Sequence, residues 1–303
     1  MTDSNPSIPK SQATAPGMKT IEADLTNVLA RMDSDDIVYS RKNGKNLHIR
    51  LVYPDQHDKE SATYPVLVHV QGSAWFKQNL NGHVFDFKDI VTNGFILAVV
   101  EYLPIPDGQF PSQIEDTKTA LRYLANHSDE LRLDMNNLFL SGDSSGGHTA
   151  LMSWATWNTP DLDASSQPLP EMRAIIDLYG VTDLTSIAKY KSAVPHDAPT
   201  SPENLLLGDF LKLDDMDKAL RASVRYYLKK DKTYPPLLIM HGNRDSVVPF
   251  EQSTELHDLC QQLGIQSEFY CVDEADHGGG PFFTREVLAI IIDFLNRHYE
   301  SQQ

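Results

Sequence analysis

Cysteine is scarce in this sequence. Its 303 residues include only two cysteines, Cys260 and Cys271, and their spacing matches no zinc or haem motif. We therefore expect two free thiols in a reducing compartment, with a single disulfide as the alternative. Residues 1–20 lack the apolar segment of a secretory signal and are rich in Ser, Pro, Thr and Asn. They predict a disordered tail, and together with free thiols they favour a cytoplasmic protein.

Long apolar runs and an excess of basic residues are also missing. No uninterrupted apolar run of about 18 residues occurs, so the sequence predicts no transmembrane helix. Lys and Arg number 26 against 42 Asp and Glu, which gives a formal net charge of −16 at pH 7. Nucleic acids and anionic membranes attract basic surfaces, so we expect neither as a partner. The expected partner is a small molecule, and the composition does not bear on the oligomeric state.

Short apolar segments alternate along the chain with segments of helical spacing. The β-branched runs at 65–70 and 95–100 predict buried parallel strands, and the apolar spacing at 113–126 predicts a helix. This alternation predicts an α/β fold, in which helices cover both faces of a mostly parallel sheet. The other predicted strands are 47–53, 138–141, 173–179, 236–241 and 267–272, and the other predicted helices are 21–32, 147–157, 251–263 and 284–299.

Two segments interrupt the alternation. Residues 158–172 contain three prolines, and residues 182–232 mix prolines, charges and short apolar runs. Because both lie between predicted sheet elements, we expect them to be short, polar insertions on one rim of a single domain that spans residues 21–303. Insertions at the carboxyl edge of such a sheet commonly shape the ligand crevice, so we expect a small crevice.

A Gly-Asp-Ser-Ser-Gly sequence at 142–146 lies between a predicted strand and a predicted helix. G-x-S-x-G in this context is typical of a nucleophile elbow, in which a sharp turn exposes the central serine at a helix N-terminus. Ser144 is the predicted nucleophile, and the backbone N–H of Ser145 is the first predicted oxyanion donor. A chance match in a glycine turn is the alternative, and the strand–turn–helix context disfavours it.

Residues 71–75, Gln-Gly-Ser-Ala-Trp, directly follow an apolar strand. A loop in this position supplies the remaining oxyanion donors in hydrolases that carry the elbow. We expect the N–H of Ser73 as the second donor and that of Ala74 as a possible third, with a plain strand-ending turn as the alternative. His69 lies within the strand itself and is expected in the core.

The other two members of a catalytic triad are predicted from the chain order serine, acid, histidine. Asp245 lies in a loop after a predicted strand, and Asp273 and Asp276 are the alternatives for the acid. His277 follows the last predicted strand and precedes three glycines, which leave its ring accessible. His148, just after the elbow, is expected to pack beside it. The predicted chemistry needs no metal and no organic cofactor.

Taken in order, these motifs resemble those of α/β-hydrolase esterases. The resemblance is to the feruloyl/acetyl-xylan esterase-like (BD-FAE-like) branch, related to the hormone-sensitive-lipase group, and it covers about residues 45–298. It implies the α/β-hydrolase fold and carboxylester hydrolysis through an acyl-enzyme. Gln71 and Leu103 depart from the pattern, since relatives have a histidine and an arginine there. The segments that carry the resemblance are 71–75, 101–116, 142–148, 201–208, 241–249 and 276–280.

Three functions fit this combination. The leading one is a carboxylesterase for short acyl, or aromatic acyl, esters. The alternatives are a serine peptidase of the prolyl-oligopeptidase kind and a non-catalytic small-molecule-binding protein on the same fold. Trp75 and Phe282 are expected to line the substrate pocket.

Overall fold

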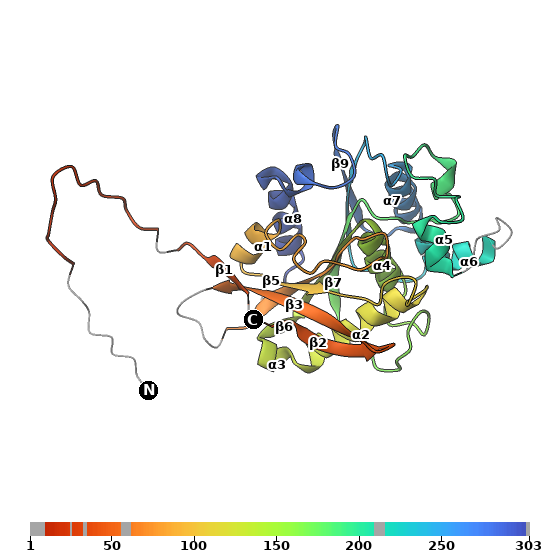
Figure 1. Cartoon of the computed structure of the whole chain (residues 1–303), viewed down its shortest axis with the longest axis horizontal. Helices are drawn as coiled ribbons and strands as arrows, with labels where there is room; N and C mark the ends of the chain where they lie inside the picture. Colours follow the sequence, from red (N-terminus) through yellow and green to blue (C-terminus); the bar gives the residue numbers. More distant parts are fainter. Residues whose placement is uncertain (1–9, 25, 33–34, 56–61, 209–215, 301–303) are drawn as a thin grey trace.

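The computed structural model describes residues 10–24, 26–32, 35–55, 62–208 and 216–300. Its centre is a sheet with the strand order β1-β3-β5-β4-β6-β7-β8-β9, and β2 pairs with β3 (Figure 1). From β5 through β9 every neighbouring pair is parallel, whereas β1, β2 and β3 add an antiparallel edge. The strands are β1 Leu29–Met32, β2 Ile37–Lys42, β3 Lys45–Asp55, β4 Tyr64–Val70, β5 Ile96–Val100, β6 Leu133–Asp143, β7 Met172–Leu178, β8 Leu237–Gly242 and β9 Ser267–Val272.

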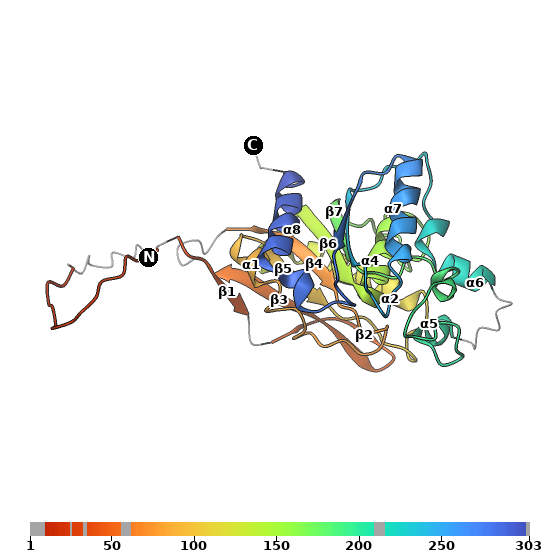
Figure 2. The ribbon, with the colours of Figure 1, turned by 90° about the horizontal axis from the view of Figure 1, so that it is seen from above.

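Helices cover both faces of the sheet, as the sequence predicts. α1 and α8 lie on one face, and α2, α4 and α7 lie on the other (Figure 2). Each face of the sheet packs against its helices in a separate hydrophobic core, and alternate residues of the central strands point into the two cores. Val68 belongs to the core under α2 and α4, and Leu67 to the core under α1 and α8. The α-helices are α1 Lys88–Thr92, α2 Ser112–Asn126, α3 Ser128–Leu131, α4 Ser144–Ala155, α5 Pro202–Leu207, α6 Met216–Arg221, α7 Glu251–Leu263 and α8 Arg285–Arg297; the 3₁₀ helices are η1 Ile187–Lys189, η2 Val224–Tyr226 and η3 Gly280–Phe283.

The predicted helix at residues 21–32 is wrong. The end of this segment is strand β1, which pairs antiparallel with β3 and sets Arg31 opposite Tyr53. A helix would need a surface on which to bury its apolar side, yet Ile21 is 91% exposed. Pairing with a sheet edge therefore prevails over local helix preference. Residues 10–20 of the predicted tail contain no helix or strand, and residues 1–9 lie outside the described part of the chain.

One insertion lies at the amino ends of the parallel strands and the other at their carboxyl ends, so the expectation of one common rim is wrong. Residues 158–172 connect the end of α4 to the start of β7, where Met172 pairs with Leu138 at the amino end of the parallel strands. Residues 182–232 instead follow the carboxyl end of β7, beside which β6 ends and α4 begins. Only this second insertion is placed to border a site at the carboxyl edge.

Two further properties of the chain can be read from the described residues. Cys260 is buried, Cys271 is exposed, and both thiols are free, as expected. Among the helices described, none combines the length and the apolar character that a membrane span requires.

Candidate active site

Ser144 stands at the junction of β6 and α4 with a left-handed backbone, φ 51°. Such a conformation is rare for a residue with a Cβ, and here two glycines make it possible. A Cβ on Gly142 would lie 2.3 Å from the carbonyl oxygen of Gly146, and one on Gly146 would lie 2.0 Å from that of Val70. Only side-chain-free residues permit this turn, which sets the Ser144 hydroxyl at the N-terminus of α4.

Three side chains from separate loops meet at the carboxyl edge of the sheet. The Nε2 atom of His277 lies 2.9 Å from Ser144 Oγ, and its Nδ1 atom lies 2.7 Å from Asp245 Oδ2. Asp245 follows β8 and His277 follows β9. Because β6, β7, β8 and β9 are parallel, their carboxyl ends lie at one edge, and the three residues come together from far apart in the sequence.

The carboxylate of Asp245 is held in its charged form. Burial raises its pKa, but hydrogen bonds from His241 and His277 outweigh that effect and lower the pKa to about 2. Its second oxygen, Oδ1, accepts the backbone N–H groups of Val247 and Val248, both at 2.8 Å. A fully hydrogen-bonded, ionised carboxylate can orient an imidazole and stabilise its protonated form.

The two alternative acids are not hydrogen-bonded to the imidazole of His277. Oδ1 of Asp276 accepts the N–H of Ser246 at 2.8 Å, its hydroxyl at 2.7 Å and the backbone N–H of His277 at 2.7 Å. Asp273 accepts the side-chain amide of Asn243. Asp276 therefore connects the loop that carries Asp245 to the loop that carries His277 and holds the two loops together.

Two side chains beside the triad were not predicted as its neighbours. The Nε2 atom of His241 lies 3.0 Å from the same Asp245 oxygen that His277 contacts. The ring of Tyr179 stands edge-on to that of His277, with centroids 4.9 Å apart. The spacing of His241 and Asp245 after a strand was a usable signal, whereas nothing in the sequence marks Tyr179.

The loop at 71–75 is bound to the elbow on both sides of the nucleophile. The N–H of Gly72 donates to Asp143 Oδ1 at 2.7 Å. The N–H groups of Ser73 and Trp75 donate to Ser145 Oγ at 2.9 and 3.1 Å. The N–H of Ser73, the expected second oxyanion donor, is thus engaged by a side chain.

A buried charge cluster lies behind the elbow. Nε2 of His69 is 3.2 Å from Asp143 Oδ1, and Nε2 of His83 is 3.5 Å from Oδ2. Burial raises the pKa of Asp143, but the two nearby histidines outweigh that effect and lower it. Burial lowers the pKa of His83, but Asp143 and Asp86 outweigh this effect and raise it to about 9. His69, expected in the core, is fully buried and burial lowers its pKa, so the positive charge that balances Asp143 resides on His83.

The same three side chains have the donor atoms that a metal ion would need. The donor atoms of His69, His83 and Asp143 lie within 4.8 Å of one another, which is close enough to share a metal ion. The charge balance does not require one, since protonated His83 already faces the carboxylate. Asp143 has a partner for each oxygen, because Gly72 donates to one and His83 faces the other. We therefore describe the cluster as an ion pair that supports the elbow.

A sequence model of the BD-FAE family matches residues 52–259. The chain belongs to this family. It is 27% identical to the probable carboxylic ester hydrolase LipM of Mycobacterium tuberculosis over 69% of this chain and 48% of that protein. It is 25% identical to the esterase LipC of the same organism over 81% of this chain and 61% of that protein. The chain thus spans less than two thirds of the length of either relative.

Solved structures show the same fold. A truncated carbohydrate esterase from gut microbiota superimposes with a TM-score of 0.74 at 23% identity, over 91% of this chain and 98% of that one. Esterase 2 of Thermogutta terrifontis with bound propionate gives a TM-score of 0.69 at 20% identity, over 87% of this chain and 93% of that one. The α/β-hydrolase fold predicted from the sequence is confirmed.

Two expected pocket residues of this BD-FAE family chain are buried. Trp75 is 1% exposed and donates from Nε1 to His148 Nδ1 at 3.3 Å, beside the elbow where His148 was expected. Phe282 is fully buried and packs on Tyr179 with ring centroids 4.5 Å apart. Neither presents surface to a substrate, so the expectation that they line the pocket is wrong. Their large apolar area is used to pack the oxyanion loop and the ring that supports His277.

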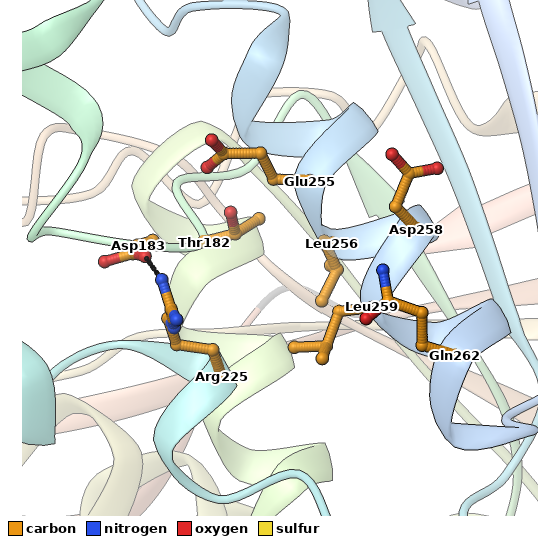
Figure 3. Close-up of a pocket in the computed structure, with 8 residues that line it drawn as sticks. All are labelled: Thr182, Asp183, Arg225, Glu255, Leu256, Asp258, Leu259 and Gln262. Carbon is orange, nitrogen blue, oxygen red and sulfur yellow. Dashed lines mark hydrogen bonds and ion pairs between the residues drawn. The ribbon is translucent and has the colours of Figure 1, made fainter.

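A depression of about 300 Å³ lies beside α7 (Figure 3), and neither Ser144, Asp245 nor His277 lines it. Asp183 and Arg225 form an ion pair at 3.1 Å on one wall. Oε1 of Gln252 accepts the backbone N–H groups of Thr182 and Asp183. These contacts fix the start of the 182–232 insertion on α7. The lining residues are Thr182, Asp183, Arg225, Glu255, Leu256, Asp258, Leu259 and Gln262.

Proposed function

We propose that this chain is a carboxylesterase that works through an acyl-enzyme on Ser144. The observation that carries the proposal is the continuous hydrogen-bond chain from Ser144 Oγ through His277 to Asp245. This arrangement on an elbow is the minimum that serine-dependent acyl transfer requires. Membership of the BD-FAE family and the esterase names of its relatives support the same chemistry.

The mechanism follows from the positions of these atoms. Nε2 of His277 takes the proton of Ser144 as Oγ attacks the ester carbonyl, and Asp245 stabilises the imidazolium that forms. The backbone N–H groups of Ala74 and Ser145 face the negative charge that develops on the carbonyl oxygen. His277 then gives its proton to the leaving alcohol. In the second half-reaction it activates a water that cleaves the acyl-enzyme.

The substrate class we propose is a short acyl ester, with aromatic acyl esters such as ferulates as a wider possibility. The support comes from the 182–232 insertion, which borders the carboxyl edge. The N–H of Ala193 donates to the carbonyl oxygen of Ser246 at 2.7 Å, and Ser192 Oγ donates to that of Val247 at 2.8 Å. The insertion is therefore tied to the loop that carries Asp245, and a long acyl chain that needs more room beside Ser144 would have to break these contacts. For the location of the chain we propose the cytoplasm, since two free thiols suit a reducing compartment.

A hydrolysis panel tests the proposal. We would compare p-nitrophenyl esters from acetate to laurate, methyl ferulate, acetylated xylan and a chromogenic dipeptide, using the wild-type chain and Ser144→Ala. Ester turnover that disappears in Ser144→Ala is the expected result. Turnover of the dipeptide alone would indicate a peptidase, and binding without turnover of any substrate would indicate a non-catalytic protein; either result would contradict the proposal.

A further inference from the structure

The oxyanion loop contains two consecutive residues in a left-handed conformation. Ala74 has φ 52° and Trp75 has φ 59°, and neither is glycine. Side chains with a Cβ disfavour this region, and such backbone persists only where the surroundings hold it in place. The loop therefore needs a partner that fixes it.

The partner that contacts the backbone on both sides of Ala74 is the hydroxyl of Ser145 on the elbow. Ser145 Oγ accepts the N–H of Ser73 at 2.9 Å and the N–H of Trp75 at 3.1 Å, which are the two amides that flank Ala74. Ser145 is 1% exposed, so water does not compete freely for these donors. The hydroxyl of Tyr102 lies 3.3 Å from Ser73 Oγ, and it therefore contacts the same loop.

These contacts determine which amide remains available. The N–H of Gly72 is used by Asp143, and those of Ser73 and Trp75 are used by Ser145. Among the described residues, no atom accepts a hydrogen bond from the N–H of Ala74. The N–H of Ser145 lies in the first turn of α4, where backbone donors have no partner within the helix.

We propose that Ser145 is a positioning residue whose hydroxyl holds the oxyanion loop so that Ala74 N–H, paired with Ser145 N–H, stabilises the oxyanion. This inference rests on the proposed function and adds to it a role for the side chain of Ser145, distinct from that of its backbone. Without Oγ, two buried N–H groups lose their acceptor and the left-handed turn loses its support. The Ala74 donor then moves away from the position that the oxyanion occupies.

The test compares Ser145→Ala with Ser153→Ala. Ser153 is a fully buried serine on the same helix, and among the described residues its hydroxyl bonds only the carbonyl oxygen of Thr149. It therefore controls for the loss of a buried hydroxyl. The first readout is steady-state hydrolysis of p-nitrophenyl acetate. We expect Ser145→Ala to lower kcat by about 10- to 100-fold, less than or comparable to the loss of one oxyanion donor, with KM changed by less than about threefold. Ser153→Ala should stay within about twofold of wild type in kcat.

The second readout does not depend on ester turnover. A fluorophosphonate phosphonylates an activated serine: Ser144 Oγ bonds to phosphorus, its proton passes to His277, and fluoride leaves, while the phosphoryl oxygen occupies the oxyanion site. Mass spectrometry gives the labelling rate, which should fall in Ser145→Ala by the same factor as kcat. The labelling rate of Ser145→Cys, whose sulfur is a weak hydrogen-bond acceptor, should lie between those of the wild-type chain and Ser145→Ala. This variant replaces Ser145→Ala in the test if Ser145→Ala does not fold.

The outcomes separate the two proposals. Labelling of the wild-type chain without ester turnover would contradict the proposed esterase, while the labelling rates would still decide the role of Ser145. Equal labelling of folded wild type and Ser145→Ala would overturn the positioning role even if the esterase stands. Absence of labelling in the wild-type chain would overturn both.

Discussion

His241 contacts the same carboxylate oxygen of Asp245 that His277 uses, at 3.0 Å. One oxygen thus accepts from two imidazoles, and His241 is locked on its other side by Ser253 Oγ at 2.7 Å. The acid of the proposed triad is therefore fixed before any substrate arrives.

Removal of the carboxylate charge should abolish most of the activity. Asp245→Asn keeps the shape of the side chain but favours the wrong tautomer of His277, and we expect kcat to fall by about four orders of magnitude. Asp273→Asn is the matched control, since Asp273 bonds only Asn243 among the described residues, and it should keep most of the wild-type activity. A variant ranking in which Asp273→Asn is the inactive one would rule out Asp245 as the acid.

Loss of the second imidazole should have a milder effect on rate and a clear effect on stability. His241→Gln removes a buried contact to Asp245 and to Ser253, and we expect a loss of about 1–3 kcal/mol in the free energy of unfolding, with kcat lowered by no more than about tenfold. His257→Gln, on α7, provides a partly buried comparison. Chemical denaturation of both variants measures the difference, and equal stability of the two would contradict the supporting role of His241.

The ion pair between His83 and Asp143 should make stability depend on pH in the alkaline range. Because the folded-state pKa of His83 is raised to about 9, its stabilising contribution is complete below the unfolded pKa of about 6.5 and is lost as the pH rises through 9. Its full size is at most about 3 kcal/mol. Urea titrations between pH 6 and 10 should show this decline in the wild-type chain and a flatter curve in His83→Gln. Parallel curves would show that the charge on His83 does not support the elbow.

Longer acyl chains should lower kcat/KM. We expect kcat/KM to be highest for acyl chains of roughly two to four carbons, because longer chains must displace the insertion tied to Ser246 and lose alignment with Ser144. The p-nitrophenyl series measures this directly. A preference for laurate over acetate, or activation at an emulsified triglyceride interface, would contradict it.

The sequence was sufficient to predict the elements that carry the site. The bounds predicted for α7 and β9 agree with the structure, and the structure brings together Ser144, Asp245 and His277 at hydrogen-bond distances. Local signals were strong here, because a G-x-S-x-G turn and a glycine-rich loop after a strand have few alternative geometries. The family resemblance is likewise confirmed.

Features that depend on tertiary contact could not be read in this way. The helical spacing at 21–32 carries no information about the free sheet edge that makes its end a strand. Trp75 and Phe282 look like pocket residues in the sequence, yet both are buried. The part of Ser145 that the sequence singled out was its backbone, whereas the contact between its hydroxyl and the loop at 71–75 exists only once β4 and β6 lie side by side.

The most direct test of the central claim is the identification of the acyl-enzyme. We would mix the wild-type chain with p-nitrophenyl acetate, measure the pre-steady-state release of p-nitrophenolate, quench in acid and locate the acetyl group by peptide mass spectrometry. The account predicts a burst of one equivalent per chain and an acetyl group on Ser144, with neither in Ser144→Ala, whereas Ser145→Ala should retain the adduct and form it more slowly. An acetyl group on Ser145 or another residue, or full turnover by Ser144→Ala, would contradict the account.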